Sequence, residues 1–279
     1  MSSPPTHIPK QALALLTNPG KVAIYESTGG LVTAQFAAHN LSLIPPIPAN
    51  AIIHDNASGS GTVSRAILST KPPPQNITIH ATDIDQAFLD ALQSDTTHNS
   101  WPIRVSNQNS NTLSFENDFF THSITNIGIL FFSPAGASEI HRTLQPAGTA
   151  IVNCWSDITW LAPIAATSFR TRGARPPLPP VNWQDGTHLR KVMLDAGFKE
   201  EKLRIEKSEA WAKTGDLRGW AERTWAFLGG LGGWKEGDEK RWDEAVDMLV
   251  EGLLEQEGTK RVGDEVWMRA SQWVAVATK

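Results

Sequence analysis

Cysteine is almost absent from this sequence of 279 residues, in which Cys154 is the only one. A single thiol excludes an internal disulfide and every zinc site that is built from several cysteines. Basic charge is not in excess, because 25 lysines and arginines stand against 29 aspartates and glutamates. No lysine- or arginine-rich stripe is interleaved with aromatic residues, so nucleic acid is not an expected partner.

Long apolar runs are also missing. No stretch approaches the roughly 20 apolar residues that cross a membrane, and the first residues, MSSPPTHIPK, lack the apolar core of a signal peptide. We therefore expect a soluble, cytoplasmic protein that does not bind membranes, either a monomer or a weak homodimer. Tyrosine occurs once and tryptophan 11 times; these indoles either line a pocket for a flat apolar ligand or fill the core.

The chain divides into three predicted segments. Residues 1–10 are polar and contain proline, which predicts a disordered tail. Residues 11–42 carry apolar residues at helical spacing, interrupted by an Asn-Pro-Gly and a Gly-Gly sequence, and predict an N-terminal helical cap in two or three pieces. Residues 43–279 follow as one domain, a length that a single hydrophobic core can still support.

From residue 51 onwards, apolar strand-like stretches alternate with amphipathic helical stretches. This alternation predicts parallel strands joined by right-handed helical crossovers. Residues 119–132, FFTHSITNIGILFF, are expected to form one long buried strand. The later segments predict a polar strand at 200–212, helices at 216–228 and 236–257, and a final strand at 266–279. The expected fold is α/β and Rossmann-like, with seven mostly parallel strands, helices on both faces and the helical cap.

The first predicted strand leads into a glycine-rich turn, within AIIHDNASGSGTVSRAIL at residues 51–68. Asp55 ends the strand, and Gly59 and Gly61 precede a predicted helix. This order lets the backbone approach a nucleotide closely, although two glycines can also make only a tight turn. Ser64 replaces the third glycine of the dinucleotide fingerprint, and the Gly-Lys-Ser/Thr ending of a P-loop is missing. The turn therefore favours a nucleoside-like ligand over a triphosphate.

A second acidic residue follows at a matching distance. The next predicted strand ends at Asp83, 22 residues beyond Gly61. An acidic residue about 20 positions after a glycine-rich turn, at the end of the neighbouring strand, accepts hydrogen bonds from ribose hydroxyls. Because ligands of open α/β sheets bind beyond the carboxyl ends of the strands, we expect Asp55, Asp83, Asn126 and Trp155 around one crevice.

Taken together, four ordered motifs in residues 50–155 resemble class I S-adenosylmethionine-dependent methyltransferases. IIHDNASGSG resembles their first motif, an acidic residue followed by Gly-x-Gly-x-Gly, and HATDIDQAFLDAL resembles the second. SNTLSFENDFFTHSITNIGILFF is similar to the fourth-strand region of the ubiquinone C-methyltransferase-like group, and EIHRTLQPAGTAIVNCW to the post-motif Glu-x-x-Arg-x-Leu-x-Pro-Gly-Gly. The whole chain looks most like fungal secondary-metabolite methyltransferases, including the one that thiomethylates gliotoxin.

The resemblance implies S-adenosylmethionine as the cofactor, with some departures from the usual motifs. Ala57 stands for the first glycine of the first motif and Ala147 for a glycine of the post-motif, and one added methyl group still permits a close approach. Tyr25, on the cap, would close over the methionine part of the cofactor, or else is a packed aromatic residue. Asn109 and Ser110 would face adenine in place of the usual acidic residue. The residues expected to bind the cofactor are Tyr25, Asp55, Asn56, Ala57, Gly59, Gly61, Asp83, Ile84, Asn109, Ser110 and Asn126.

The activity implied is methyl transfer to an O, N or S atom of an apolar small molecule. Positioning and desolvation can catalyse this transfer without a dedicated base when the nucleophile is a thiolate or phenolate, so no catalytic residue is assigned. No set of ligating residues has the spacing of a metal site, and none is expected. Four histidines are expected to be structural: His54, His80, His122 and His141. The acceptor is expected to contact Trp155, Trp160, Phe169, Trp183 and His39, each of which alone is more typical of core or surface.

Two other functions stay open. A methyltransferase-like protein can bind the cofactor and catalyse a reaction without methylation, such as a cyclisation. A nicotinamide-dependent oxidoreductase also needs a glycine-rich turn, but the missing third glycine disfavours it.

Overall fold

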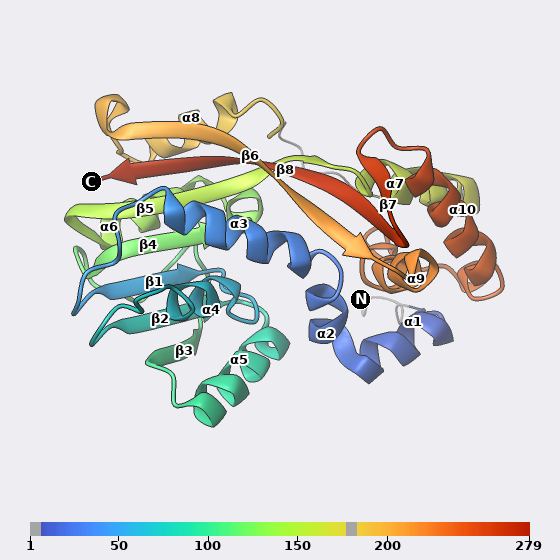
Figure 1. The fold of residues 1–279 in the computed structure, drawn as a ribbon, viewed down its shortest axis with the longest axis horizontal. Coiled ribbons are helices and arrows are strands. Elements are labelled where there is room, and N and C mark those ends of the chain that lie inside the picture. The colour runs from blue at the N-terminus through green and yellow to red at the C-terminus, as the bar shows by residue number, and fades with distance from the viewer. Residues whose placement is uncertain (1–6, 177–182) are drawn as a thin grey trace, which may run out of the picture. The chain divides into compact units, whose positions relative to one another are not determined.

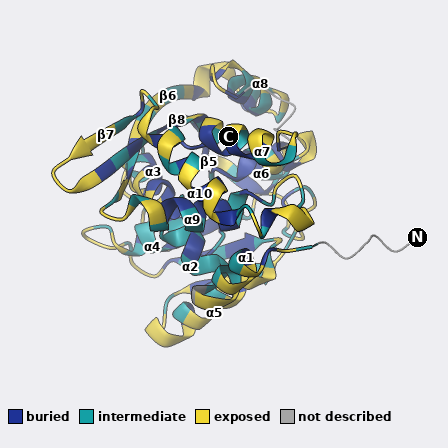
Figure 2. Ribbon diagram, turned by 90° about the vertical axis from the view of Figure 1, so that its right-hand side faces the viewer, coloured by how far each residue is buried: buried dark blue, intermediate teal, exposed yellow. Residues whose placement is uncertain are grey.

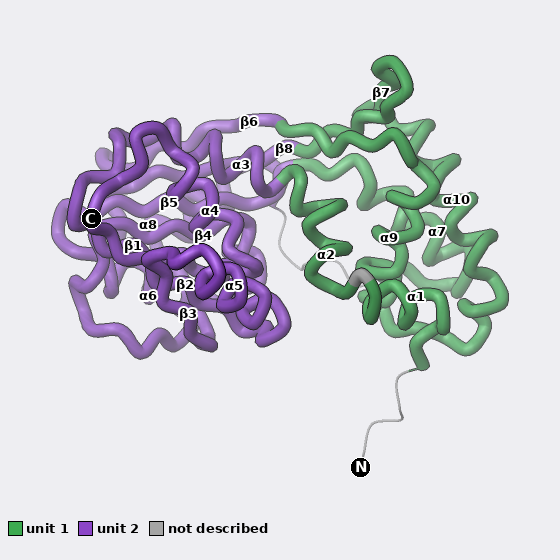
Figure 3. Tube along the Cα trace, turned by 60° about the horizontal axis from the view of Figure 1, so that its bottom comes forward, with its two compact units in different colours: residues 1–32, 157–180, 210–270 green, residues 33–156, 181–209, 271–279 purple. Residues whose placement is uncertain are grey.

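The computed structural model describes residues 7–176 and 183–279, so most of the expected disordered tail lies outside the described residues (Figure 1). The chain forms two compact units (Figure 3). Unit 1 contains residues 1–32, 157–180 and 210–270, and unit 2 contains residues 33–156, 181–209 and 271–279. A single domain over residues 43–279 stays a prediction.

The sheet of the protein has the strand order β3-β2-β1-β4-β5-β8-β6, and unit 2 contains β1 to β4 and parts of β5, β6 and β8. The short β7 belongs to unit 1 and pairs with the first residues of β8, which belong to the same unit. Strands β1 to β5 pair in parallel, and the β6 and β8 arrows point in opposite directions in Figure 1. The strand order reverses between β1 and β4, which is the switch point of a Rossmann-like sheet. The predicted fold class is confirmed, and the strands are β1 (Ile52–Asn56), β2 (Thr78–Asp83), β3 (Ile103–Asn107), β4 (Phe120–Asn126), β5 (Leu144–Ile158), β6 (Leu203–Thr214), β7 (Thr259–Val262) and β8 (Glu265–Thr278).

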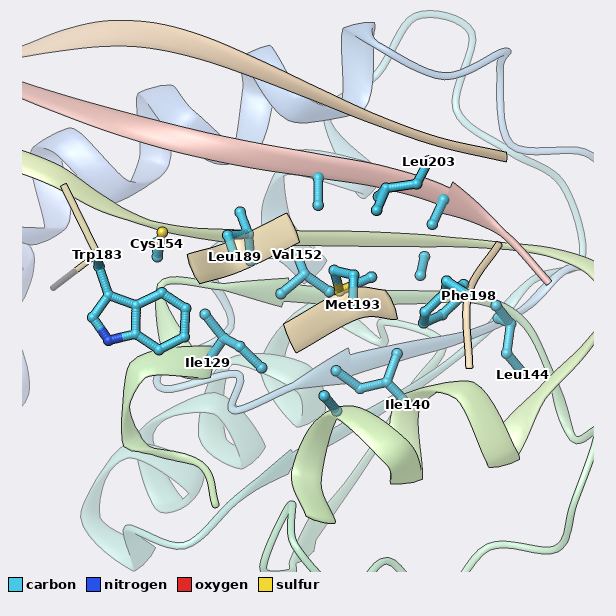
Figure 4. Packing of buried hydrophobic residues seen from close by; sticks show 14 of the residues in the cluster. Ile129, Ile140, Leu144, Val152, Cys154, Trp183, Leu189, Met193, Phe198 and Leu203 are labelled. Atoms are coloured by element: carbon cyan, nitrogen blue, oxygen red, sulfur yellow. The ribbon is translucent and has the colours of Figure 1, made fainter. Parts of the chain in front are cut away.

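Helices cover both faces of this sheet. Ile67 and Leu92 belong to a core cluster on one face, which α3, α4 and α5 cover, and Ile151 of β5 points into it. Val152 points to the opposite face and packs with Met193 under α6 and α8 (Figure 4). This alternation is the period of two that a strand imposes. The helices are α3 (Gly30–Ser42), α4 (Thr62–Leu68), α5 (Gln86–Asn99), η2 (Gly128–Phe131), α6 (Pro134–Thr143), α8 (Thr187–Asp195) and η3 (Glu200–Lys202).

The segment expected as one long strand, residues 119–132, is divided in the structure. Strand β4 ends at Asn126, and Gly128–Phe131 form the short 3-10 helix η2. Between them Ile127 has φ 67° and ψ −5°, which is the left-handed region. The expectation was wrong because a short continuous apolar run does not distinguish a buried strand from a buried turn.

Unit 1 is mainly helical and has a core rich in tryptophan. The guanidinium of Arg172 lies 4.8 Å from the ring centroid of Trp225 and 4.7 Å from that of Trp234. Arg172 also pairs with Asp238 at 2.9 Å, and both side chains are buried. Some of the many indoles therefore fill core. The helices of this unit are α1 (Lys10–Leu15), η1 (Leu16–Gly20), α2 (Lys21–Glu26), α7 (Leu161–Arg172), α9 (Leu217–Leu228), η4 (Glu236–Asp238) and α10 (Trp242–Leu254).

Strand β7 was not predicted from the sequence. Its residues are mostly exposed, as Figure 2 shows, and it pairs antiparallel with the first residues of β8. The expected helix at 236–257 is also shorter, because η4 and a turn precede α10. In the two stretches that the structure describes, no helix is long and apolar enough to span a membrane.

Candidate functional site

Polar side chains gather at the carboxyl edge of the sheet, near the switch point. The register pairs Asn56 of β1 with Thr82 of β2, and Asn126 of β4 with Asn153 of β5. Because these strands are parallel, their carboxyl ends meet at one edge of the sheet. The predicted residues Asp55, Asp83 and Asn126 all belong to these strand ends.

Asp83 fastens the glycine-rich turn to the end of β2. The backbone N–H of Gly59 donates to Asp83 Oδ2 at 2.8 Å, and the N–H of Asp85 donates to Oδ1 at 2.8 Å. Each carboxylate oxygen keeps a further lone pair that can accept from a ligand hydroxyl. The neighbouring Ile84 is 71% exposed and presents an apolar side chain beside this carboxylate.

Asp55 is turned inwards and bonds to the helix that follows the turn. Its Oδ2 accepts from the Ser64 N–H at 3.0 Å and from the Ser64 hydroxyl at 2.6 Å, and its side chain is buried. Burial raises the pKa of Asp55 to about 6, although the two bonds from Ser64 act to lower it. The serine in the third-glycine position thus connects α4 to β1, a role that the sequence analysis missed.

The two glycines of the turn have different surroundings. Both have positive φ, 53° at Gly59 and 90° at Gly61, which favours glycine. A Cβ at Gly59 would find only Phe88 Cδ1, at 4.0 Å, whereas a Cβ at Gly61 would collide with the side chain of Leu92 in α5. The space beside Gly59 is available to a ligand, and that beside Gly61 is filled by the protein.

Asn56 links the end of β1 to two other segments. Its side-chain amide donates to Thr125 Oγ1 at 3.1 Å, and its Oδ1 accepts from the Ser110 hydroxyl at 2.8 Å. Ser110 is buried, whereas Asn109 is exposed and accepts from the Asn111 N–H at 2.9 Å. The pair predicted to face adenine therefore also shapes the loop after β3.

Trp155 and His39, two of the predicted acceptor contacts, lie on β5 and α3 of unit 2. The ring of Trp155 packs edge to face on Phe36 of α3, with centroids 5.7 Å apart. His39 Nε2 is buried without a hydrogen-bond partner. Trp183, the third acceptor candidate of this unit, is 9% exposed and packs in the core cluster of Figure 4.

The other predicted contacts belong to unit 1. Tyr25 of α2 packs near Phe227, with ring centroids 5.9 Å apart. Trp160 is buried and packs edge to face on Trp220 at 5.5 Å. Phe169 of α7 is 53% exposed. Their roles as ligand contacts stay predictions.

The histidines pack among aromatic rings. His54 stacks on Phe120 with centroids 4.6 Å apart, and its Nε2 lies 2.9 Å from Thr82 Oγ1. Burial lowers the pKa of His54 to about 3, and burial also lowers the pKa of His80, His122 and His141. Among residues 7–176 and 183–279, no three His, Cys, Asp or Glu side chains form a group that could hold a metal ion.

Sequence reasoning also missed Phe131 and Asn153. Phe131 is a large apolar side chain that is 77% exposed at the end of η2, the short helix that follows β4. Asn153 is fully buried inside β5. The signal for Asn153 was available, because a polar side chain within the apolar sequence IVNCW must find buried partners.

Comparisons with known proteins show similarity in structure only. No protein-family model matches the chain, and no curated protein matches its sequence. Phosphoethanolamine N-methyltransferase 2 of Haemonchus contortus, in complex with phosphomonomethylethanolamine and S-adenosylhomocysteine, has a TM-score of 0.56 at 15% identity, covering 92% of this chain and 56% of its own. YcgJ of Bacillus subtilis has a TM-score of 0.54 at 14% identity, covering 86% and 99%.

The [4+2]-cyclase SpnF is similar to the same extent. Its TM-score is 0.52 at 15% identity, with 88% of this chain and 80% of that chain covered. Sequence identities this low do not assign the chain to a family, but the structural similarity shows that the fold is the same. The chain has the Rossmann-like fold that these methyltransferase and cyclase structures share.

Proposed function

We propose that this protein binds S-adenosylmethionine and transfers its methyl group to an O, N or S atom of an apolar small molecule. The observation that carries the proposal is the contact between Asp83 Oδ2 and the Gly59 N–H, which joins an acidic strand end to a glycine-rich turn. A nucleoside-binding edge of an open α/β sheet combines a glycine-rich turn with an acidic residue at the end of the neighbouring strand, and this contact places the two side by side.

The residues at this edge suit the cofactor in three respects. Asp83 keeps free lone pairs for ribose hydroxyls, the space beside Gly59 is open, and Ile84 offers an exposed apolar side chain for a base. Asn109 and Ser110 are proposed to lie beside the adenine, and Asn126, Asn56 and Ala57 beside the methionine part. Asp55 and Gly61 contribute indirectly. The Asp55 carboxylate is bonded to Ser64, and the space that a side chain at Gly61 would need is filled by Leu92.

When bound, the cofactor supplies an electrophilic methyl group on a sulfonium. The chain has to hold the acceptor in line with that methyl group and keep water out, which is catalysis by positioning and desolvation. Trp155, packed on Phe36, and the exposed Phe131 are the proposed apolar contacts for the acceptor in unit 2. We assign no general base, which suits an acceptor thiolate or phenolate.

A second candidate function is a reaction on the same site without methyl transfer. The similarity to the cyclase SpnF supports it, because a protein of this fold carries that activity. The finer resemblance, to fungal secondary-metabolite methyltransferases such as the gliotoxin thiomethyltransferase, stays a prediction from the sequence.

Product analysis separates the two functions. The protein is incubated with S-adenosylmethionine and panels of apolar thiols, phenols and amines, and mass spectrometry follows both products. Methyl transfer predicts equal amounts of S-adenosylhomocysteine and of an acceptor heavier by one methylene unit. Binding of the cofactor without any S-adenosylhomocysteine, whichever acceptor class is offered, would contradict methyl transfer and favour the second candidate.

A further inference from the structure

The turn after β4 has a backbone conformation that its sequence does not favour. Ile127 has φ 67° and ψ −5°, and it is buried. A β-branched residue in the left-handed region is a genuine outlier, and such residues persist only when their surroundings hold them. Strained residues of this kind cluster at ligand-binding sites.

One buried side chain holds this turn on both sides. Asn153 of β5 accepts from the Ile127 N–H through Oδ1 at 3.1 Å, and its amide donates to Asn126 Oδ1 at 2.9 Å. The same amide also donates to Gln272 Oε1. Asn153 is fully buried, so these bonds do not compete with water.

The network continues from Asn153 to α3. Gln272 of β8 exchanges two hydrogen bonds with Asn40 of α3, at 2.6 and 3.2 Å, and donates to Ser208 Oγ at 2.8 Å. Asn126 donates to the Thr33 carbonyl at 3.0 Å. Four strands and one helix thereby fix the position of the amide of Asn153.

The strained turn lies against the glycine-rich turn. A Cβ at Gly128 would come within 2.7 Å of the Cβ of Ala57, so Gly128 is packed against the Ala57 methyl group and leaves no room for a side chain there. Ala57 itself has φ 55°. A relaxation of Ile127 to negative φ would move Gly128, and with it the surface on which Ala57 rests.

We propose that Asn153 is a positioning residue of the cofactor site. It holds Ile127 in the left-handed conformation, and this keeps Gly128 packed against Ala57 and the glycine-rich turn in its binding geometry. The proposal rests on the proposed binding of S-adenosylmethionine, and it assigns to Asn153 no contact with the cofactor.

Substitution of Asn153 and Ile127, singly and together, tests the proposal. The affinity for S-adenosylhomocysteine is measured by calorimetry, and the melting temperature by circular dichroism. Asn153→Ala is expected to weaken binding at least tenfold. Ile127→Gly, which adopts positive φ without a side-chain clash, is expected to stay within about threefold of wild type. When Ile127 is already glycine, Asn153→Ala should weaken binding by a factor at least three times smaller than the factor by which it weakens binding in the wild type.

The matched control is Gln145→Ala, at the other end of β5. It removes one side-chain hydrogen bond within the same strand, from Gln145 Nε2 to the Phe119 carbonyl at 3.0 Å, and should leave affinity unchanged. A purely structural role for Asn153 predicts a lower melting temperature with no rescue of affinity by Ile127→Gly, and that result overturns the proposal. An unchanged affinity of Asn153→Ala for S-adenosylhomocysteine also overturns the proposal. A wild-type protein that does not bind S-adenosylhomocysteine instead refutes the proposed function.

If Asn153→Ala does not fold, the proposal is tested on the wild-type protein by measuring hydrogen exchange of the Ile127 amide. The Ile127 amide should be protected in the free protein, because its acceptor is buried, and more protected with S-adenosylhomocysteine bound. Fast exchange of this amide in the free protein, or protection that does not change on binding, overturns the proposal.

Discussion

Asp83→Ala is expected to remove most of the affinity for S-adenosylhomocysteine. A hydrogen bond to a charged group contributes about 1.5–3 kcal/mol, and the ribose has two hydroxyls. Because about 1.4 kcal/mol is a factor of ten in affinity, the loss of both bonds predicts a decrease of about a hundredfold or more. The variant also leaves the Gly59 and Asp85 N–H groups without their present acceptor, so a lower melting temperature is expected as well.

Asp85→Ala is the matched control, two residues further along the chain. The Asp85 carboxylate caps α5 by accepting from the Ala87 N–H at 3.1 Å. Loss of a cap costs about 0.5–2 kcal/mol of stability, but the affinity should stay close to wild type. Calorimetric titration of both variants, with melting temperatures measured alongside, separates binding from folding. An equal loss of affinity in the two variants, or an unchanged affinity in folded Asp83→Ala, would refute the ribose assignment.

Three further predictions concern the turn, the buried carboxylate and the acceptor. Gly59→Ala should weaken S-adenosylhomocysteine binding, measured by calorimetry, at least tenfold. Because both glycines have positive φ, both alanine variants should melt at a lower temperature, and Gly61→Ala should lose more because its Cβ also collides with Leu92 of α5. The reverse pattern would contradict the open space beside Gly59. The pKa of Asp55 is raised from 3.8 to about 6 in the folded protein, so its contribution to the free energy of unfolding should fall by up to about 3 kcal/mol as pH rises from about 4 to 6. The free energies of unfolding in urea of wild type and Asp55→Asn should therefore diverge over this pH range. The same pH dependence in both proteins would rule the shift out. Phe131→Ala should raise the KM of an apolar acceptor several-fold in steady-state kinetics without changing S-adenosylhomocysteine affinity, and an unchanged KM would exclude it from the acceptor site.

Much of the sheet could be predicted because its signals are local. Strands β1 and β2 are short and have an acidic residue next to or at their last position, Asp55 and Asp83. The glycine-rich turn between β1 and α4 has the small residues that positive φ requires. The spacing of the two motifs predicted that Asp83 ends the strand beside β1, and the structure has it there. These features depend on few residues outside each segment.

The missed features depend on partners far away in the chain. Asp55 resembles a ligand-binding carboxylate in the sequence, and only the packing of α4 on β1 brings Ser64 to it. Ile127 belongs to an apolar run that predicts a strand, and it turns because Asn153, 26 residues later, accepts from its N–H. Tertiary contacts here override local preference, as they commonly do in strands.

The most direct test of the account is a crystal structure of the protein with S-adenosylhomocysteine bound. The account predicts the ribose hydroxyls within hydrogen-bond distance of the Asp83 carboxylate, about 2.6–3.2 Å, with the backbone of Gly59 against the ligand and Ile84 against its base. A ligand bound elsewhere on the protein, or at this edge without a contact to Asp83, would contradict the central claim.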